Sequence, residues 1–200
     1  SPRTQSALLE AMGEQQVTID GQTRPLDAPF LCIATQNPVE FHGTYPLPEA
    51  QLDRFSVRLE LGYVSEDEEL QILMSQQRGQ LLQDIQPVAS ADEIIALQQS
   101  VRNVMMEESV ARYLIRLVAA SRDAIGVQLG VSTRGSLQLA RMARAYALIQ
   151  GRDYVLPEDL KGLAEPVLAH RLVLDTQSRY SGADKSTVIQ DLIDRVPIPR

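Results

Sequence analysis

Residues 30–38 read Phe30-Leu31-Cys32-Ile33-Ala34-Thr35-Gln36-Asn37-Pro38, a run of five apolar residues with a polar end. Such an uninterrupted run, bounded by Pro29, predicts a strand buried on both faces, as in a parallel sheet. Residues 56–61 alternate like a second strand, and Asp20-Gly21 within residues 17–23 is the strongest short-range signal for a β-hairpin. The first third of the chain therefore predicts α/β structure.

This first part also predicts two helices but no finished sheet. Ser1-Pro2 begins a helix that Gly13 stops, and Pro48 begins a short one. A hairpin and two strands leave a doubly buried strand without enough neighbours. Either a partner completes the sheet or the sequence begins in the middle of a domain, and we favour the second explanation.

From Ser65 onward the pattern is helical only. The predicted helices cover 66–82, 91–101 (capped by Ser90), 110–121, a fourth begun by Ser132 or Thr133, a fifth from 157 toward His170, and part of a sixth at 188–193. The fourth should bury Leu139, Met142, Ala143, Tyr146 and Ile149. No Gly/Ser-rich or Pro-rich tract lies near residues 63–65, which indicates a change of architecture rather than a flexible linker.

Composition excludes several classes of protein. The 200 residues hold 19 basic and 26 acidic side chains, a net charge of −7, which argues against electrostatic binding of nucleic acid. Cys32 is the single cysteine, so disulfides and Cys-rich zinc sites are excluded, and we expect no metal site. The longest apolar run, residues 28–34, is too short to span a membrane, and no leader opens the chain. We therefore expect a cytoplasmic protein.

Asn37 is the first candidate for chemistry. It follows the predicted central strand, at the edge where open α/β sheets bind ligands. A neutral amide there can orient a water molecule or a phosphate oxygen. The alternative is that Asn37-Pro38 forms only a turn, because both residues favour turns.

Two arginines are the other candidates. Arg54, at the end of the short helix begun by Pro48, could be an ordinary cation at a helix C-terminus. Arg134 lies in the first turn of a predicted helix, where the dipole disfavours a cation, so a purely structural role is the weaker reading. An arginine beside the free N–H groups of a helix start makes a good anion site. The alternative for Arg134 is a solvated basic face that continues with Arg141 and Arg144.

No phosphate-binding loop is found. The segment that ends in Lys185-Ser186 lacks both glycines of that motif, with Asp184 and Arg179 in their places. No apolar strand ends in Asp-Glu, so the carboxylate that would hold magnesium is also missing.

Several segments together resemble the MoxR-type AAA+ ATPases. They are residues 4–12, the hairpin at 17–26, Ala34-Thr35-Gln36-Asn37-Pro38, residues 43–55, Thr133-Arg134-Gly135 and residues 153–159. The resemblance covers nearly the whole chain in the right order. The segment that ends in Arg54 is specific, and the others support it.

The resemblance implies a fold and a set of roles. The fold would be α/β and mostly helical: residues 1–64 as the incomplete carboxyl-terminal part of an AAA+ parallel-sheet core with its hairpin, and residues 65–200 as an all-α lid domain. Asn37 matches sensor 1, Arg54 the arginine finger, and Arg134 sensor 2, which touches the nucleotide. The family's phosphate loop and Walker B carboxylates are absent here, so we expect this chain alone to be inactive.

The resemblance also implies cofactors and partners for the intact protein. It would hydrolyse ATP with Mg²⁺ as a homo-oligomer, in the form of a hexameric ring, and would remodel protein clients in the manner of a chaperone. A von Willebrand A-type protein is an expected partner, whereas nucleic acid is not. The alternative is a helical module that binds a protein partner without nucleotide, and a DNA-binding regulator is disfavoured by the negative charge.

Overall fold

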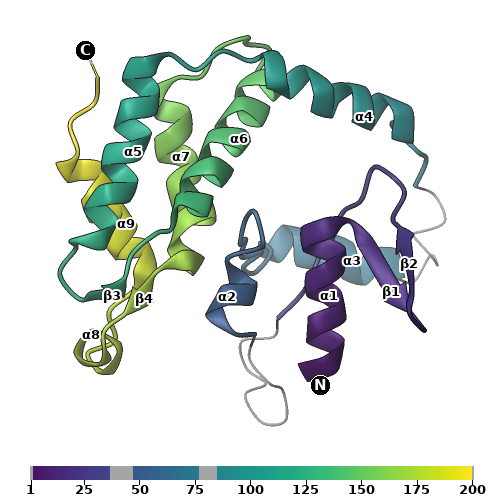
Figure 1. Ribbon diagram of the computed structural model, residues 1–200, viewed down its shortest axis with the longest axis horizontal. Helices are drawn as coiled ribbons and strands as arrows, with labels where there is room; N and C mark the ends of the chain where they lie inside the picture. Colours follow the sequence, from purple (N-terminus) through teal and green to yellow (C-terminus); the bar gives the residue numbers. More distant parts are fainter. Residues whose placement is uncertain (1, 37–46, 77–84, 200) are drawn as a thin grey trace.

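The structure is a computed structural model that describes residues 2–36, 47–76 and 85–199. It has two parts that follow one another in the chain (Figure 1). The N-terminal part (residues 2–76) holds α1, β1, β2, α2 and α3. The helical part (residues 104–196) holds α5, α6, α7 and α9 side by side, and α4 extends from one end of it toward the N-terminal part. The overall prediction of mostly helical α/β structure is confirmed.

The hairpin forms as its sequence predicts. Helix α1 (Pro2–Glu14) leads into β1 (Gln16–Ile19), which pairs antiparallel with β2 (Gln22–Pro25). The turn between them is Asp20-Gly21, with φ angles of 51° and 76°. A two-residue turn with both φ angles positive matches the twist of the strands, which is why Asp-Gly is favoured there. Helix α1 continues through Gly13, so the expected stop at that residue is wrong by one position.

The two predicted strands are not formed. Residues 30–34 and 56–61 belong to no sheet. Leu31 and Ile33 are 78% and 80% exposed, so the predicted burial on both faces is contradicted. The physical reason is that a strand is stabilised by ladder hydrogen bonds to a neighbour, and no strand lies beside these segments within the described residues.

Two helices complete the N-terminal part. Helix α2 (Glu49–Leu52) follows Pro48, as expected. Helix α3 (Glu66–Gln76) opens with four acidic residues, which suit the positive end of a helix dipole. The last residues of the helix predicted over 66–82 lie outside the described residues.

The helical part agrees with the sequence in its local rules. Helix α4 (Ala91–Ser100) begins with a capping box in which Ser90 accepts from the Glu93 N–H and Glu93 accepts from the Ser90 N–H. The 3-10 turn η2 (Val101–Asn103) leads to α5 (Glu108–Arg122), and Ser132 caps α6 (Thr133–Ile149). Helix α7 (Pro157–Leu168) ends in η3 (Ala169–Arg171), and α8 (Thr176–Tyr180) and α9 (Lys185–Arg195) follow. A short ribbon of β3 (Val127–Leu129) and β4 (Val173–Leu174), which the sequence did not indicate, closes one end.

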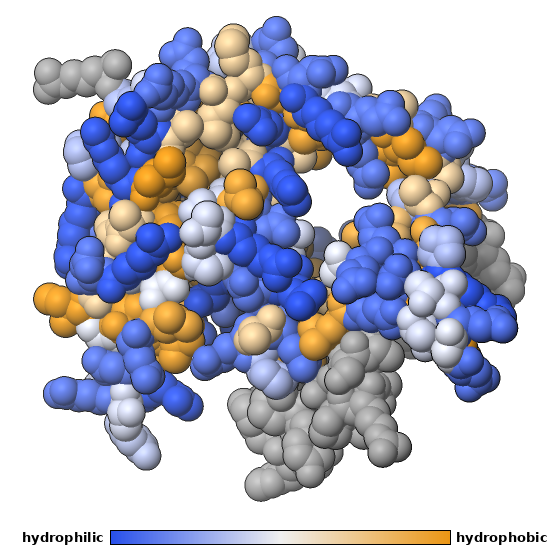
Figure 2. All heavy atoms as spheres, in the orientation of Figure 1, coloured by the Kyte–Doolittle hydropathy of each residue, from blue (hydrophilic) through white to orange (hydrophobic). Residues whose placement is uncertain are grey.

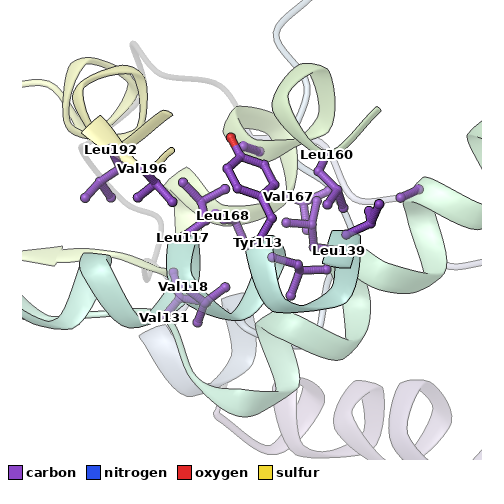
Figure 3. Packing of buried hydrophobic residues seen from close by; sticks show 14 of the residues in the cluster. Tyr113, Leu117, Val118, Val131, Leu139, Leu160, Val167, Leu168, Leu192 and Val196 are labelled. Carbon is purple, nitrogen blue, oxygen red and sulfur yellow. The ribbon is translucent and has the colours of Figure 1, made fainter. Parts of the chain in front are cut away.

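The core lies in the helical part. Tyr113, Leu117, Leu139, Leu160 and Leu168 are at most 1% exposed and pack where α5, α6 and α7 meet (Figure 3). The buried face of α6 is narrower than predicted: Leu139, Ala143 and Ala147 are buried, whereas Tyr146 is 41% and Ile149 79% exposed. The two alanines let α6 approach α7 closely, so its contact stripe follows every fourth residue and leaves the larger side chains outside.

The surface is mostly polar. The face drawn in Figure 2 is largely hydrophilic, with apolar residues in scattered groups over both parts. Among the helices that the structure describes, none combines the length and the apolar character that a membrane crossing requires.

Candidate functional site

The two parts of the molecule meet at a segment that follows α2. Asp53 caps the C-terminus of this one-turn helix, and the N–H groups of Arg54 and Phe55 donate to the carbonyls of Gln51 and Leu52 at 3.1 Å each. The chain then runs along the end of α7, where the Arg58 N–H donates to the Pro166 carbonyl at 2.8 Å. Val57 packs against the helical core. The residues around Arg54 are therefore held by contacts with the helical part.

Arg171 provides most of these contacts. Its side chain is only 1% exposed, and its Nε lies 3.0 Å from Asp53 Oδ1. Nη2 donates to the carbonyl oxygens of Phe55 at 2.6 Å and Asp53 at 3.2 Å. Nη1 donates to the Val167 carbonyl and reaches the Ser56 carbonyl at 3.5 Å. One buried guanidinium thus joins η3 to three backbone carbonyls around Arg54, those of Asp53, Phe55 and Ser56.

His170 supports Arg171 from the adjacent position. Its Nε2 lies 2.7 Å from Arg171 Nη1 and 3.2 Å from the Phe55 carbonyl. Burial, and then the positive charge of Arg171, lower the pKa of His170 from 6.5 to about 4. The imidazole is therefore neutral at neutral pH, which avoids a second charge in this buried place.

Asp53 also reaches the start of α6. Ser132 Oγ donates to Asp53 Oδ2 at 3.4 Å and accepts from the Gly135 N–H at the same distance. Arg134 follows two residues later and is exposed. Burial chiefly lowers the pKa of Arg171, the nearby Asp53 carboxylate opposes this, and the positive charge of Arg134 adds to the lowering. We call Asp53, Phe55, Ser132, His170 and Arg171 the junction.

The structure brings two of the three predicted site residues to this junction. Arg54 is half-buried and its guanidinium lies against α1: a Cβ placed on Gly13 would be 2.5 Å from Arg54 Nη1. Neither Arg54 nor Arg134 forms an ion pair with another residue that the structure describes. Asn37, the third candidate, lies outside the described residues. Both arginines therefore keep charges that no described carboxylate neutralises, on segments that Asp53 ties together.

The charges of Arg54 and Arg134, beside the junction, suit a phosphate group better than a metal ion. Arg134 stands in the first turn of α6, where backbone N–H groups and the helix dipole also favour an anion. Across the described ranges, no group of three or more His, Cys, Asp or Glu side chains could hold a metal ion. These residues could therefore contact an anionic ligand, but they offer no ligand set for Mg²⁺.

Arg171 and Asp53 were not found from the sequence. The contacts of Arg171 lie up to 118 positions away in the chain. Periodicity and capping rules report only near neighbours, so no signal in the sequence alone connected the two residues.

Comparison with known proteins gives consistent matches along the chain. Residues 1–57 match a protein-family model described as the ATPase family associated with various cellular activities (AAA), and residues 119–192 match the AAA lid domain. The YeaC protein of Bacillus subtilis (strain 168) is 46% identical over 199 residues, which are 100% of this chain and 62% of YeaC.

A named chaperone and a solved structure also match. The chaperone MoxR1 of Mycobacterium tuberculosis (strain ATCC 25618 / H37Rv) is 38% identical across 99% of this chain and 54% of its own length. A crystal structure of a candidate ATPase from Cytophaga hutchinsonii ATCC 33406 superposes with a TM-score of 0.93 at 39% identity, over 100% of this chain and 63% of that one. The chain thus spans less than two thirds of the length of each of these relatives.

Proposed function

Because this chain belongs to the MoxR-type family of AAA+ ATPases, we propose that it acts within an ATP hydrolase that works as a ring of subunits. One observation supports the proposal above the others. The two arginines that resemble the family's arginine finger and sensor 2 lie on segments joined through Asp53, and neither is neutralised by a described carboxylate. We infer that both guanidinium groups serve the phosphates of bound ATP.

Arg54 is the proposed arginine finger. Hydrolysis spreads negative charge over the γ-phosphoryl oxygens, and a cation placed beside them stabilises the transition state. Arg54 would reach into the site of the neighbouring subunit, so activity would require the ring. Its backbone is fixed on both sides by Arg171, which suits a side chain that must meet a neighbour in a defined position.

Arg134 and Asn37 would act in the subunit's own site. Arg134, carried at the exposed start of α6, would contact the phosphates and report the nucleotide state to the helical part. Asn37 would hold the attacking water or a γ-oxygen. Mg²⁺ bound with the ATP would neutralise phosphate charge, and its ligands would come from residues other than those described.

The biological role follows from the family. We propose that ATP hydrolysis drives the remodelling of protein partners, in a hexamer and in the cytoplasm, with a von Willebrand A-type protein as one partner. The Mycobacterium tuberculosis relative is named a chaperone, which supports this role.

The test is ATP turnover by the full-length protein with Arg54→Ala. Removal of an arginine finger costs about 10³- to 10⁵-fold in rate, or roughly 4 to 7 kcal/mol of barrier. ATP binding, measured separately with a fluorescent nucleotide, should be largely retained. A loss of turnover smaller than about tenfold would overturn the finger assignment.

Arg58→Ala is the matched control. Arg58 lies four residues further along the same segment, and its exposed side chain pairs with Glu60. Exposed ion pairs contribute about 0–1 kcal/mol, so turnover should stay within about fivefold of the original. The 200-residue chain by itself should show no hydrolysis, and magnesium-dependent turnover by a clean preparation would contradict that expectation.

A further inference from the structure

We propose that Arg171 and Asp53 form a clasp through which the helical part of one subunit positions the Arg54 finger that the same subunit offers to its neighbour. The inference rests on the proposed function, because it needs Arg54 to act in trans. It adds a positioning residue, Arg171, whose guanidinium binds the backbone carbonyls on both sides of Arg54.

The pattern of contacts supports this role. Nη2 of Arg171 donates to the carbonyls of Asp53 and Phe55, which are the residues immediately before and after Arg54. The backbone of Arg54 is therefore held from both sides while its side chain remains outside the clasp. A planar guanidinium has five donors in a fixed fork, so it can hold two carbonyls and a carboxylate at once, which a lysine ammonium cannot do with the same geometry.

Both partners of the Asp53 carboxylate come from the helical part. Arg171 ends η3, and Ser132, the other partner of the Asp53 carboxylate, begins α6. If the phosphate contact of Arg134 rotates the helical part, Arg171 and Ser132 would move with it. The nucleotide bound in a subunit's own site would thus affect the position of Arg54 through Ser132, Arg171 and Asp53, without a long path through the core.

A second buried ion pair provides the matched control. Arg152 and Asp159 form a two-bond pair with Nη1–Oδ2 2.8 Å and Nη2–Oδ1 2.6 Å, with side chains 21% and 5% exposed. Both residues lie within the helical part, and Asp159 also accepts from the Leu156 N–H at 2.8 Å. Their loss should weaken the helical part without touching the residues around Arg54.

The first measurement is steady-state ATP turnover by the full-length protein. Arg171→Lys keeps the charge but loses the fork, so the finger is misplaced, and a displacement near 1 Å can cost about 10²-fold in kcat. KM for ATP should change less than about threefold, because the subunit's own binding groups are intact. Asp53→Asn is the second variant, in case Arg171→Lys does not fold. Asp53 is partly exposed and asparagine has the same shape, so this variant should fold and should lower kcat about tenfold. Arg152→Ala should leave kcat within about threefold.

The second measurement uses mixed rings made by co-expression. An Arg171→Lys subunit has an intact site and a misplaced finger, whereas an Arg134→Ala subunit has a damaged site and an intact finger. Rings that contain both should turn over ATP more than about tenfold faster than rings of Arg171→Lys alone, because some interfaces combine the two intact halves. Rings that combine Arg171→Lys with Arg54→Ala should show no such recovery. Asp53→Asn replaces Arg171→Lys in these mixtures if the latter does not assemble.

The mixtures separate failure of the clasp from failure of the proposed function. If Arg54→Ala with Arg134→Ala does not recover, the finger does not act in trans, and the proposed function is wrong. If that pair recovers but Arg171→Lys with Arg134→Ala does not, Arg171 acts on its own site and the clasp is overturned. A loss of kcat by Arg152→Ala as large as that of Arg171→Lys would likewise overturn it, because general weakening would then explain both.

Discussion

The N-terminal part and the helical part differ sharply in what holds them together. Every residue of the main hydrophobic cluster lies between Val104 and Val196. Among the residues before Val104 whose burial the structure describes, Ala11 is the one buried apolar side chain, whereas Leu61 and Tyr63 are almost fully exposed. The helical part therefore has its own core, and the N-terminal part is fixed to it chiefly by the hydrogen bonds of the junction. The stability of this chain therefore resides in the helical part, whereas two of the three proposed site residues, Asn37 and Arg54, lie outside that part of the sequence.

Leu160→Ala should have the largest effect on stability. Leu160 is 0% exposed in α7, and replacing a buried leucine with alanine costs about 2–5 kcal/mol through lost burial and the cavity left behind. Thermal unfolding followed by circular dichroism should show a clear fall in Tm.

Leu31→Ala is the matched substitution in the N-terminal part. Leu31 is 78% exposed, so the same change should alter the free energy of unfolding by about 0.5 kcal/mol or less. Equal losses for Leu31→Ala and Leu160→Ala would mean that the two parts share one core, contrary to this comparison.

Acidic pH should destabilise the junction, because His170 is buried there as a neutral imidazole. The folded pKa of His170 is lowered from 6.5 to about 4, by burial first and by Arg171 and Arg58 in addition, against the opposing Asp53 carboxylate and Phe55 carbonyl. The unfolded state then binds more protons between these two values, so stability falls as pH falls from 6.5 toward 4, by about 3 kcal/mol. Above 6.5 the contribution is constant.

His170→Gln isolates this contribution from other acid groups. The amide does not titrate, so the difference in unfolding free energy between the two proteins should change across that window and stay level above it. Parallel curves for both proteins across the whole window would show that the neutral imidazole is not required at the junction.

Arg134→Ala should separate binding from stability. Arg134 is exposed in the first turn of α6, where the helix dipole disfavours a cation, so its removal should raise stability by a few tenths of a kcal/mol. In the full-length protein ATP affinity should fall about tenfold, because a charge-assisted hydrogen bond contributes about 1.5 kcal/mol. Titration with nucleotide and thermal unfolding on one preparation measure both, and unchanged affinity would count against the sensor 2 role.

The sequence predicts what depends on neighbours along the chain. Asp20-Gly21 gives the hairpin, Ser90 with Glu93 gives the start of α4, and Ser132 gives the start of α6, because turns and caps are made within four residues. The division near residue 64 stays a prediction, as do the roles of Asn37, Arg54 and Arg134.

What the sequence does not predict depends on distant partners. Residues 30–34 carry a strand pattern, yet a strand also needs a neighbour to pair with, and none is described beside them. Tyr146 and Ile149 have helical spacing but lie outside the stripe that α7 covers. The contact of Arg171 with the Asp53 carbonyl spans 118 positions, which no local rule reports.

Gly21→Ala should have the smallest effect on the helical part and gives the finest test of the comparison. Gly21 has φ 76° and no atom within 4 Å of a would-be Cβ, so the cost is backbone strain of about 1 kcal/mol without a clash. Since the hairpin contributes no residue to the main cluster, this cost should appear as weaker amide-exchange protection in β1 and β2, and the Tm of the helical part should not move. A parallel loss of protection in α5 or α6 would mean that the hairpin and the helical core unfold as one cooperative unit, and the separation between the two parts would then have to be given up.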